Sequence, residues 1–345
     1  MTERGRAYHL YVGVDIAADT FTAAWLPTGG TPTPPLTCDQ SPAGFADLQR
    51  RLRATGAVPA TTLVVLEATG TYWVSLAVAL HEAGYQVSVV NPLRAHHFAK
   101  AQLRRAKTDA LDARDLAQLA LALRPAPWTP PPAVYHEVRQ RLVARDALLD
   151  MRQQVRNQRH ALLQWPVVVE GVRQHLDELI ADFDRRLAAL EAEIAVALKG
   201  SMWAETLACL TSAPGIGLVT ASWLLVSTLN FTLCTGPEAL ASYAGLVPMP
   251  HESGRSVRGR PSIGHGGNGR LRTALYMATL SAARYNPAIK AMYTRLRAAG
   301  KPLKVARCAA ARKLLHQAWA LGTRQRRFDP HHRQLAPEAL PELAA

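Results

Sequence analysis

Residues 61–92 read TTLVVLEATGTYWVSLAVALHEAGYQVSVVNP, and this stretch is the most informative about the architecture of the chain. Residues 61–67 form a continuous apolar, β-branched run that predicts a buried strand. Residues 71–84 predict a helix with a glycine at its end, and residues 86–92 predict a strand that stops at a proline. Two strands joined through a helix run parallel in one sheet, so the sequence predicts a sheet with a helix packed on its face.

The flanking sequence extends this unit into a larger sheet. Residues 8–26 predict a hairpin, residues 36–39 a further strand, and Ser41 a cap for the helix FADLQRRLRAT. A last helix over residues 109–123 precedes the break RPAPWTPPP. Three strands that can pair antiparallel, followed by strand–helix–strand units, predict an α/β domain with a mixed sheet over residues 1–125. This is the element order of the RNase H/RuvC-like nuclease fold.

Long helices follow the proline-rich break. Residues 134–163 and 170–199 predict two helices within a connector over residues 126–200. The second helix repeats apolar residues at steps of four and three, as in a coiled-coil seam. The seam consists of Leu176, Ile180, Phe183, Leu187, Leu190, Ile194 and Ala197. An intramolecular helical hairpin and a dimerisation arm both fit this pattern. We expect a mainly α-helical domain over residues 201–330 and a flexible tail over residues 331–345.

Positive charge is concentrated near the C-terminus. The chain of 345 residues has a formal net charge of +14, and residues 253–328 contain 17 Lys and Arg but no Asp or Glu. The rest of the chain holds 23 basic and 26 acidic residues. Such a basic segment predicts binding to a polyanion, because neutralising phosphates releases condensed counterions. The alternative is a solvated basic surface.

The sequence lacks the features of membrane and secreted proteins. It contains no run of about 18 apolar residues and no N-terminal signal pattern, so we expect no membrane partner. The four cysteines form no CxxC pair, which argues against a disulfide framework and against a structural zinc site. We therefore expect a cytoplasmic protein.

Four carboxylates are candidate metal ligands. Asp15 and Glu67 each close an apolar, strand-like run. Asp109 and Asp112 are three residues apart at the start of a predicted helix, so they share a helix face. Mg²⁺ prefers such oxygen ligands, with Mn²⁺ as the alternative ion, and a two-metal site stabilises the attacking and leaving oxygens of a phosphodiester. We therefore predict a metal-dependent nuclease or strand-transfer core.

The helix acids also have simpler interpretations. Taken alone, Asp112 is a surface residue and Asp109 a helix cap. Asp115 continues the same face and is a weaker candidate, which we expect to be solvent-exposed or to lie behind the ligands.

The segment before this helix is basic. RAHHFAKAQLRRAKTD, residues 94–109, contains five Lys and Arg and no acid before its final residue. We expect this segment to lead phosphates toward the acids. The contacts predicted here are Arg104, Arg105 and Lys107. His96 and His97 lack a third ligand at a suitable spacing, so we predict two ordinary loop histidines.

Two glycine-rich stretches follow in the third part of the chain. SAPGIGLVTASWLL, residues 212–225, resembles half of a helix-hairpin-helix element, in which Gly215 and Gly217 let backbone amides approach a phosphate. A tight turn is the alternative. Residues 251–275 combine six Gly and five Arg with one acid, which predicts a flexible basic loop that wraps nucleic acid. The arginines offered as phosphate or RNA contacts are Arg255, Arg258, Arg260, Arg270 and Arg272.

Ser253 in this loop is a candidate nucleophile. Its hydroxyl adjoins a glycine and several arginines, and cations stabilise both an alkoxide and the charge on an attacked phosphate. Ser256 and Ser262 lie nearby, and a hydroxyl that bonds the backbone is the usual case in a glycine-rich loop. Composition alone does not decide whether the hydroxyl of Ser253 acts as a nucleophile or bonds the backbone.

Longer motifs extend over nearly the whole chain. The N-terminal part contains VGVDIA, LEATGTYW, VNPLRAHHFAKA and KTDALDARDLA, and the C-terminal part contains APGIG, YAGLVP, ESGRSVRGR and GGNGRLRTALY. In these motifs the chain resembles the transposases of the insertion sequence 110 family, the DEDD or Piv-like recombinases. Glu252 and the pair His265 and Gly266 differ from the more polar or basic residues often found there, which affects local contacts only.

The resemblance implies specific roles for five residues. The four acids of the family's RuvC-like domain fall on Asp15, Glu67, Asp109 and Asp112. The catalytic serine of its transposase domain falls on Ser253. The resemblance also implies a composite site of both domains in a dimer or tetramer, with the coiled coil in assembly. Some members use a non-coding bridge RNA that pairs with donor and target DNA.

We therefore expect a site-specific recombinase that mobilises its own insertion sequence in the bacterial cytoplasm, associated with the nucleoid. Magnesium held by the four acids would position the scissile phosphate, and Ser253 would form a transient phosphoserine link to DNA. One rival interpretation is a Holliday-junction nuclease in which the metals activate water. Another is a nucleic-acid-binding regulator without catalysis.

Overall fold

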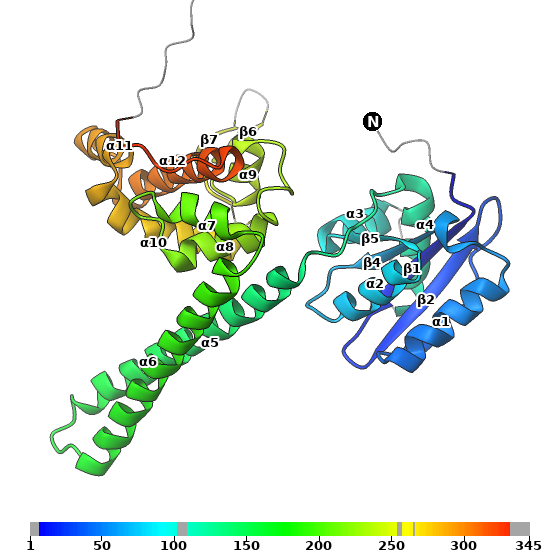
Figure 1. Cartoon of the computed structure of the whole chain (residues 1–345), viewed down its shortest axis with the longest axis horizontal. Helices are drawn as coiled ribbons and strands as arrows, with labels where there is room; N and C mark the ends of the chain where they lie inside the picture. The colour runs from blue at the N-terminus through cyan, green and yellow to red at the C-terminus, as the bar shows by residue number, and fades with distance from the viewer. Residues whose placement is uncertain (1–6, 102–108, 254–256, 265, 332–345) are drawn as a thin grey trace, which may run out of the picture. The chain divides into compact units, whose positions relative to one another are not determined.

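The computed structural model describes residues 7–101, 109–253, 257–264 and 266–331. The chain forms two compact units, residues 1–130 and residues 131–345, and each is described by itself (Figure 1). The division falls inside the proline-rich segment that follows the predicted first domain. Almost all of the predicted tail lies outside the described residues.

The first unit contains a mixed five-stranded sheet. Its strands are β1 (Leu10–Ile16), β2 (Thr20–Pro27), β3 (Leu36–Asp39), β4 (Thr62–Glu67) and β5 (Gln86–Val90). They lie in the order β3-β2-β1-β4-β5, where β3, β2 and β1 are antiparallel neighbours and β1, β4 and β5 are parallel. The mixed α/β architecture predicted from the order of elements is confirmed.

Helices cover both faces of this sheet. They are α1 (Pro42–Ala54), α2 (Trp73–Glu82), α3 (Pro92–Ala101) and α4 (Asp109–Leu123), with a 3-10 turn over Pro59–Thr61. On one face, Leu48 of α1 and Leu76 of α2 belong to the core around Val14. On the other face, Leu116 of α4 belongs to the core around Tyr11. Burial on both faces explains why β1 and β4 are almost continuously apolar.

Helix α3 differs from the prediction of a loop. Pro92 is its first residue, and the side chain of Asn91 accepts a hydrogen bond from the amide of Leu93 at 2.8 Å. Both features are favourable at a helix N-terminus. His96 and His97 are therefore exposed residues of a helix and not loop histidines, as the sequence had suggested.

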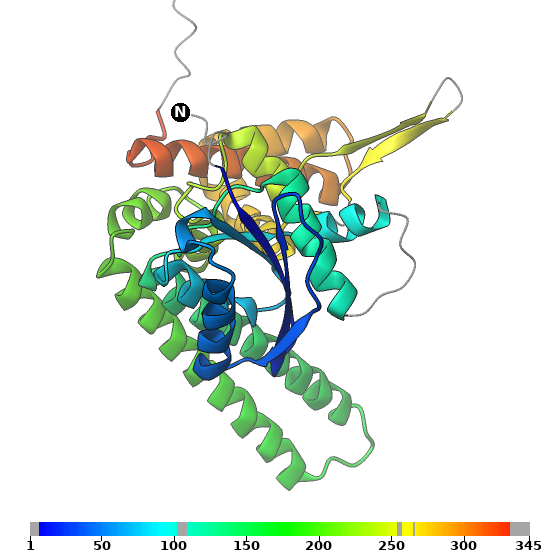
Figure 2. The same ribbon diagram turned by 90° about the vertical axis from the view of Figure 1, so that its right-hand side faces the viewer.

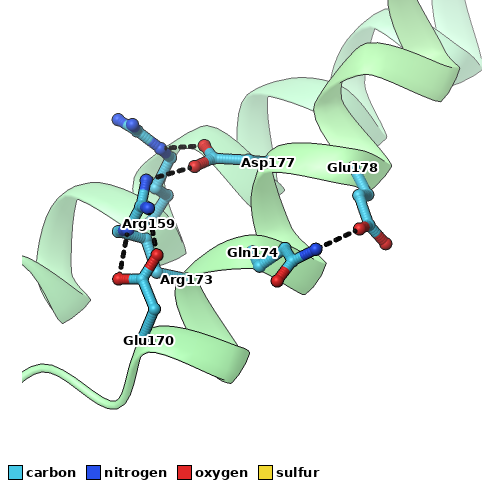
Figure 3. Close-up of polar contacts among 6 residues, drawn as sticks. All are labelled: Arg159, Glu170, Arg173, Gln174, Asp177 and Glu178. Carbon is cyan, nitrogen blue, oxygen red and sulfur yellow. Dashed lines mark hydrogen bonds and ion pairs between the residues drawn. The ribbon is translucent and has the colours of Figure 1, made fainter.

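The second unit begins with an antiparallel pair of long helices, α5 (Ala133–Leu162) and α6 (Glu170–Lys199), which we call the helical arm. Near the rest of the unit, apolar contacts join the pair, and Leu187 and Ile194 are buried. Near the arm's tip, Asp177 of α6 pairs with Arg159 of α5 and with Arg173 of its own helix (Figure 3). An intramolecular hairpin, one of the two arrangements that the seam allowed, is thus present in the chain.

The remaining helices pack around the base of the arm, and we call them the body. They are α7 (Ala204–Thr211), α8 (Leu218–Thr228), α9 (Pro237–Tyr243), α10 (Gly269–Tyr285), α11 (Pro287–Ala298) and α12 (Leu303–Arg324). One core joins Leu142 and Ile194 of the arm to Leu224 of α8, Leu275 of α10 and Leu314 of α12. The base of the arm is therefore part of the body. In the described part of the chain, no helix is both long and apolar enough to cross a membrane.

Two short strands interrupt the helices of the body. Strands β6 (Met249–Ser253) and β7 (Val257–Ser262) pair antiparallel, and we call this pair the ribbon. Figure 2 shows the ribbon projecting from the helices of its unit. The glycine and arginine content of residues 251–275 had predicted a flexible basic loop, which the strands correct. Pro250, Gly259 and Pro261 are unfavourable in strands and no apolar alternation marks the segment, so the sequence carries no strand signal here.

Candidate active site

Two predicted acids are neighbours at one edge of the sheet. Strands β1 and β4 are parallel, and their register pairs Val14 with Leu66. Asp15 and Glu67 are the next residues on these strands, so they occupy adjacent positions at the carboxyl ends. Both are partly buried. Because side chains alternate along a strand, Asp15 shares the α4-facing side of β1 with Tyr11.

Helix α4 lies directly against β1 near this edge. A Cβ atom on Gly13 would overlap the backbone of Ala113 and Ala117, so the close approach requires glycine. The core around Tyr11 continues along α4 to Leu119, which shows that the helix runs opposite to the strand. The N-terminal end of α4 therefore lies beside the carboxyl end of β1. The sequence did not single out Gly13, although its position two residues before a strand-end acid was a usable signal.

The predicted helix acids belong to that N-terminal end. Asp112 directly precedes the contact with Gly13, and Asp109 is the first residue of α4, one turn earlier. Asp112 is partly buried, whereas the side chain of Asp109 lies outside the described residues. Asp115 is only 7% exposed, which rules out the solvent-exposed alternative, while a place behind the ligands stays a prediction.

Local hydrogen bonds orient the two strand-end acids. Oδ1 of Asp15 accepts from the amide of Ile16 at 3.1 Å, and Oε1 of Glu67 accepts from Oγ1 of Thr69 at 2.9 Å. Among the side chains that the structure describes, no group of three or more His, Cys, Asp or Glu is placed to hold a metal ion, and that set omits Asp109. The donors at this edge are carboxylate oxygens, and these fit a hard divalent cation such as Mg²⁺.

Ser253 ends the first strand of the ribbon. Its backbone pairs with Val257 across the ribbon, next to the connection between the strands. The side chain of Ser253 lies outside the described residues. Several predicted nucleic-acid contacts lie outside them as well, either wholly or in their side chains: Arg104, Arg105, Lys107, Arg255, Arg258 and Arg260.

The two glycines before α8 have different surroundings. Gly215 has a φ of 102°, and a Cβ atom there would overlap Ala282 of α10, so this glycine permits close packing between the turn and α10. Gly217 is the N-cap residue of α8 and has open space around it. Contact between these amides and a phosphate stays a prediction, and Gly215 has in addition a packing role.

The two predicted arginines of α10 have partners within the protein. Nη1 of Arg270 lies 3.1 Å from Oδ2 of Asp146 on α5, and its guanidinium lies 5.5 Å from the ring centroid of Trp223. Nη1 of Arg272 donates to the carbonyl oxygen of Gly266 at 2.8 Å. The sequence did not single out Asp146, because it is one of many acids on the two arm helices.

Other cations of the body are exposed and form no salt bridge. On α11, the following turn and the start of α12, these residues are Lys290, Arg295, Arg297, Lys301 and Lys304. In the part of the chain from residue 269 to residue 331, Arg270 alone forms an ion pair. Arg307 lies 5.8 Å from the ring centroid of Tyr276, beside this basic surface. Among the described residues, no acid forms an ion pair with these exposed cations, so the helices present a positive field.

Comparison with known proteins places these features in a family. Residues 12–165 match a model for DEDD transposases of IS110 elements, described as "Transposase". Residues 207–294 match a model described as "Transposase IS116/IS110/IS902 family". The chain is 32% identical over 324 residues to the pilin gene-inverting protein of Moraxella bovis, covering 92% of this chain and 97% of that protein. This chain belongs to the IS110 family of transposases.

Other relatives of this IS110-family transposase agree with that assignment. The pilin gene-inverting protein of Moraxella lacunata is also 32% identical over 324 residues, with 92% and 97% of the two chains covered. The "insertion element IS110 uncharacterized 43.6 kDa protein" of Streptomyces coelicolor is 38% identical over 113 residues, or 33% of this chain and 27% of that protein. The transposase is therefore a DNA transposase/recombinase, as the resemblance implied.

Proposed function

We propose that this IS110-family transposase is a site-specific recombinase that mobilises its own insertion sequence by means of an acid group and a serine nucleophile. The acid group consists of Asp15, Glu67, Asp109 and Asp112, and the nucleophile is Ser253. The observation that carries the proposal is the adjacency of Asp15 and Glu67 at the carboxyl ends of β1 and β4, with Gly13 of β1 packed against α4. The mixed sheet order and these strand-end acids also support an RNase H/RuvC-like nuclease fold for the first unit.

The acids are proposed to hold magnesium, with manganese as a substitute. Asp15 and Glu67 come from a rigid sheet, and the contact between Gly13 and α4 fixes the helix that contributes the other two. When bound, the ions supply positive charge to a scissile phosphate. The role of the protein is to hold its carboxylates in one orientation around the ions.

Ser253 is proposed to attack the phosphate in the cleavage step. A bond forms between Oγ of Ser253 and phosphorus, the bond between phosphorus and the 3′ oxygen breaks, and the serine proton passes to that oxygen. The products are a phosphoserine link and a free 3′ hydroxyl, which can then be exchanged between strands. The neighbouring Arg255, Arg258 and Arg260 would stabilise charge on the attacked phosphate.

The uncompensated cations of the body are proposed to bind nucleic-acid backbone. The partners are the donor ends of the element, the target DNA and a bridge RNA that pairs with both. Arg104, Arg105, Lys107, Gly215, Gly217 and Arg272 are further proposed contacts, whereas Arg270, a contact expected from the sequence, is held by Asp146 within the protein. Assembly as a dimer or tetramer is proposed to use the helical arm. Binding to DNA would keep the protein at the bacterial nucleoid.

Inversion of a DNA segment is a second candidate function. It is favoured by the relation to two pilin gene-inverting proteins that the match covers almost completely. Both functions use the same cleavage and strand-exchange chemistry, and they differ in the arrangement of the recombining sites.

The test is a recombination assay in cells that carry the intact element and a target plasmid. We expect Asp15→Asn and Ser253→Ala each to lower recombination by roughly 10³-fold or more, because each removes a group that acts on the phosphate. The matched control is Ser262→Ala on β7, which should stay within about threefold of wild type. Normal recombination with Ser253→Ala but none with Asp15→Asn would favour a nuclease that activates water. Normal recombination with both variants would mean that neither Asp15 nor Ser253 acts in catalysis, and the proposed mechanism would be wrong.

A further inference from the structure

A series of side-chain contacts joins four helices at the start of α10. Arg270 of α10 pairs with Asp146 of α5 at 3.1 Å and lies over the buried ring of Trp223 of α8 at 5.5 Å. The adjacent Arg145 of α5 lies 3.5 Å from Asp146 and donates to Glu191 of α6 at 2.7 Å. The arm is thereby connected through polar contacts to the helix that directly follows the ribbon.

The positive charge in the first turn of α10 makes a nearby carboxylate favourable. The first turn of α10 contains Arg270 and Arg272 and no acid. The N-terminus of a helix carries a partial positive charge, so two cations there are unfavourable. Asp146 supplies a negative charge from a different helix. This carboxylate therefore fixes the position of the first turn of α10 relative to α5.

The base of the ribbon is fastened to the same turn. Asn268 caps α10 by accepting from the amide of Leu271 at 3.1 Å, and its own amide donates to the carbonyl oxygen of Tyr243 at 2.7 Å. Arg272 donates to the carbonyl oxygen of Gly266 at 2.8 Å. Gly266 and Asn268 belong to the chain that leads from β7 into α10, so these contacts hold the α10 end of that connection.

Burial limits how much the pair between Asp146 and Arg270 can stabilise the unit. Burial raises the pKa of Asp146 above its ordinary value, and the nearby Arg270 and Arg145 offset only part of that effect. The ionised carboxylate is therefore less favourable in the folded unit than in the unfolded chain. A partly buried ion pair with this balance contributes geometry more than folding free energy.

We propose that the ion pair between Asp146 and Arg270 is a positioning contact that couples the helical arm to the ribbon carrying Ser253. This inference rests on the proposed role of Ser253 as nucleophile. A change in the arm would reach β7 through the first turn of α10 and its contacts at the base of the ribbon. Small displacements of a reacting group lower rates strongly, so the pair controls the rate of strand cleavage and not the affinity for DNA.

The test uses the full chain with a duplex that carries one end of the parent element and RNA transcribed from that element. It measures the rate of strand cleavage, the dissociation constant for the duplex and the melting temperature. Asp146→Asn and Arg270→Gln should each lower the cleavage rate about tenfold, with less than about a threefold change in the dissociation constant. The double variant should be no slower than either single variant, because all three lack the same contact.

A charge exchange and a matched control make the test specific. Combining Asp146→Arg with Arg270→Asp should restore the rate to within about threefold of wild type. The control Asp184→Asn breaks an arm ion pair with Arg152, away from α10, and should leave the rate unchanged. Additive losses in the double variant of the pair would overturn the coupling. So would a loss of affinity equal to the loss of rate in Arg270→Gln, which would make this arginine a phosphate contact.

Ser253→Ala in the same assay separates the two proposals. If Ser253→Ala still cleaves, the nucleophile assignment is wrong, whatever the pair does. If Ser253→Ala is inactive and Asp146→Asn cleaves at the wild-type rate, the positioning role alone is wrong.

Discussion

The arm and the helices α10 to α12 are both rich in cations, but the two regions differ in how many of these cations form ion pairs with acids. On the arm, Arg141 pairs with Glu193 at 3.0 Å, Arg145 pairs with Glu191 at 2.7 Å, and Arg152 pairs with an acid on α6. From residue 269 to residue 331, the single ion pair is that of Arg270, and its acid comes from the arm.

This difference shows that the partners of the cations, and not their number, distinguish the two regions. Ion pairs across the arm hold its two helices together. Because the opposite charges of each pair cancel, the pair produces little electrostatic field at a distance. Cations without acids leave a field that attracts a polyanion and releases its counterions on binding. The arm is thus a structural element, and the surface around α11 and α12 is the proposed nucleic-acid surface. Three experiments test whether the two regions differ in this way.

Neutralising the free cations should have the largest effect. The variant carries Arg295→Gln, Arg297→Gln, Lys301→Gln and Lys304→Gln. We expect the dissociation constant for duplex DNA to rise roughly 10²-fold at about 0.1 M salt, and the slope of log affinity against log salt to fall by about 3 to 4. Fluorescence anisotropy at several salt concentrations measures both quantities.

The control removes the same number of charges from the arm. It carries Arg152→Gln, Arg159→Gln, Arg173→Gln and Arg185→Gln, and all four arginines are ion-paired in the structure. Its affinity for DNA should change by less than about threefold. Equal losses in the two variants would mean that net charge alone decides binding, and the comparison would then be wrong.

Removing one acid from the arm should have a smaller effect. Asp177→Asn breaks the pairs with Arg159 and Arg173, whose side chains are 37% and 36% exposed. Because such exposed pairs are weak, we expect a loss of about 1 kcal/mol or less in the free energy of unfolding, measured by denaturant titration. The control Glu178→Gln changes an acid that accepts a hydrogen bond from Gln174. Equal losses in both variants would show that the ion pairs of Asp177 have no special role.

The smallest effect should come from pH. The hydrogen bond from Arg173 lowers the pKa of Glu170 below its ordinary value. A lowered folded-state pKa stabilises the protein above the unfolded-state pKa, and this stabilisation is lost as pH falls through the folded-state value. Protection from hydrogen exchange in the first turn of α6, corrected for intrinsic rates, should therefore decline as pH falls below about 4.3. A Glu170→Gln variant should lack this decline, and the same decline in both proteins would refute the assignment to Glu170.

Local sequence signals were sufficient for most regular elements. Ser41 was predicted to cap a helix, and its Oγ accepts from the amide of Gly44 at 3.2 Å. The arm helices were predicted over residues 134–163 and 170–199, and they span Ala133–Leu162 and Glu170–Lys199. A long apolar period locates a helix well, because each turn repeats the same signal. Helix α3 lacks an apolar stripe, and its proline start alone did not reveal it.

Contacts between distant residues could not be read from the sequence in the same way. The acids Asp15 and Glu67 were recognisable as strand ends, but only the parallel register makes them neighbours. The approach of α4 to Gly13 and the pair between Asp146 and Arg270 depend on partners far along the chain. The ribbon forms despite unfavourable residues, because backbone pairing does not require an apolar pattern.

The most direct test of the proposed mechanism is a search for the covalent link to DNA. The protein is incubated with its element DNA and RNA, denatured, and digested with nuclease and protease, and the peptides are analysed by mass spectrometry. We predict a nucleotide attached to the peptide that contains Ser253, and none in the Ser253→Ala variant. Cleaved DNA without an adduct, or an adduct on a different residue, would contradict the assignment of Ser253 as the nucleophile.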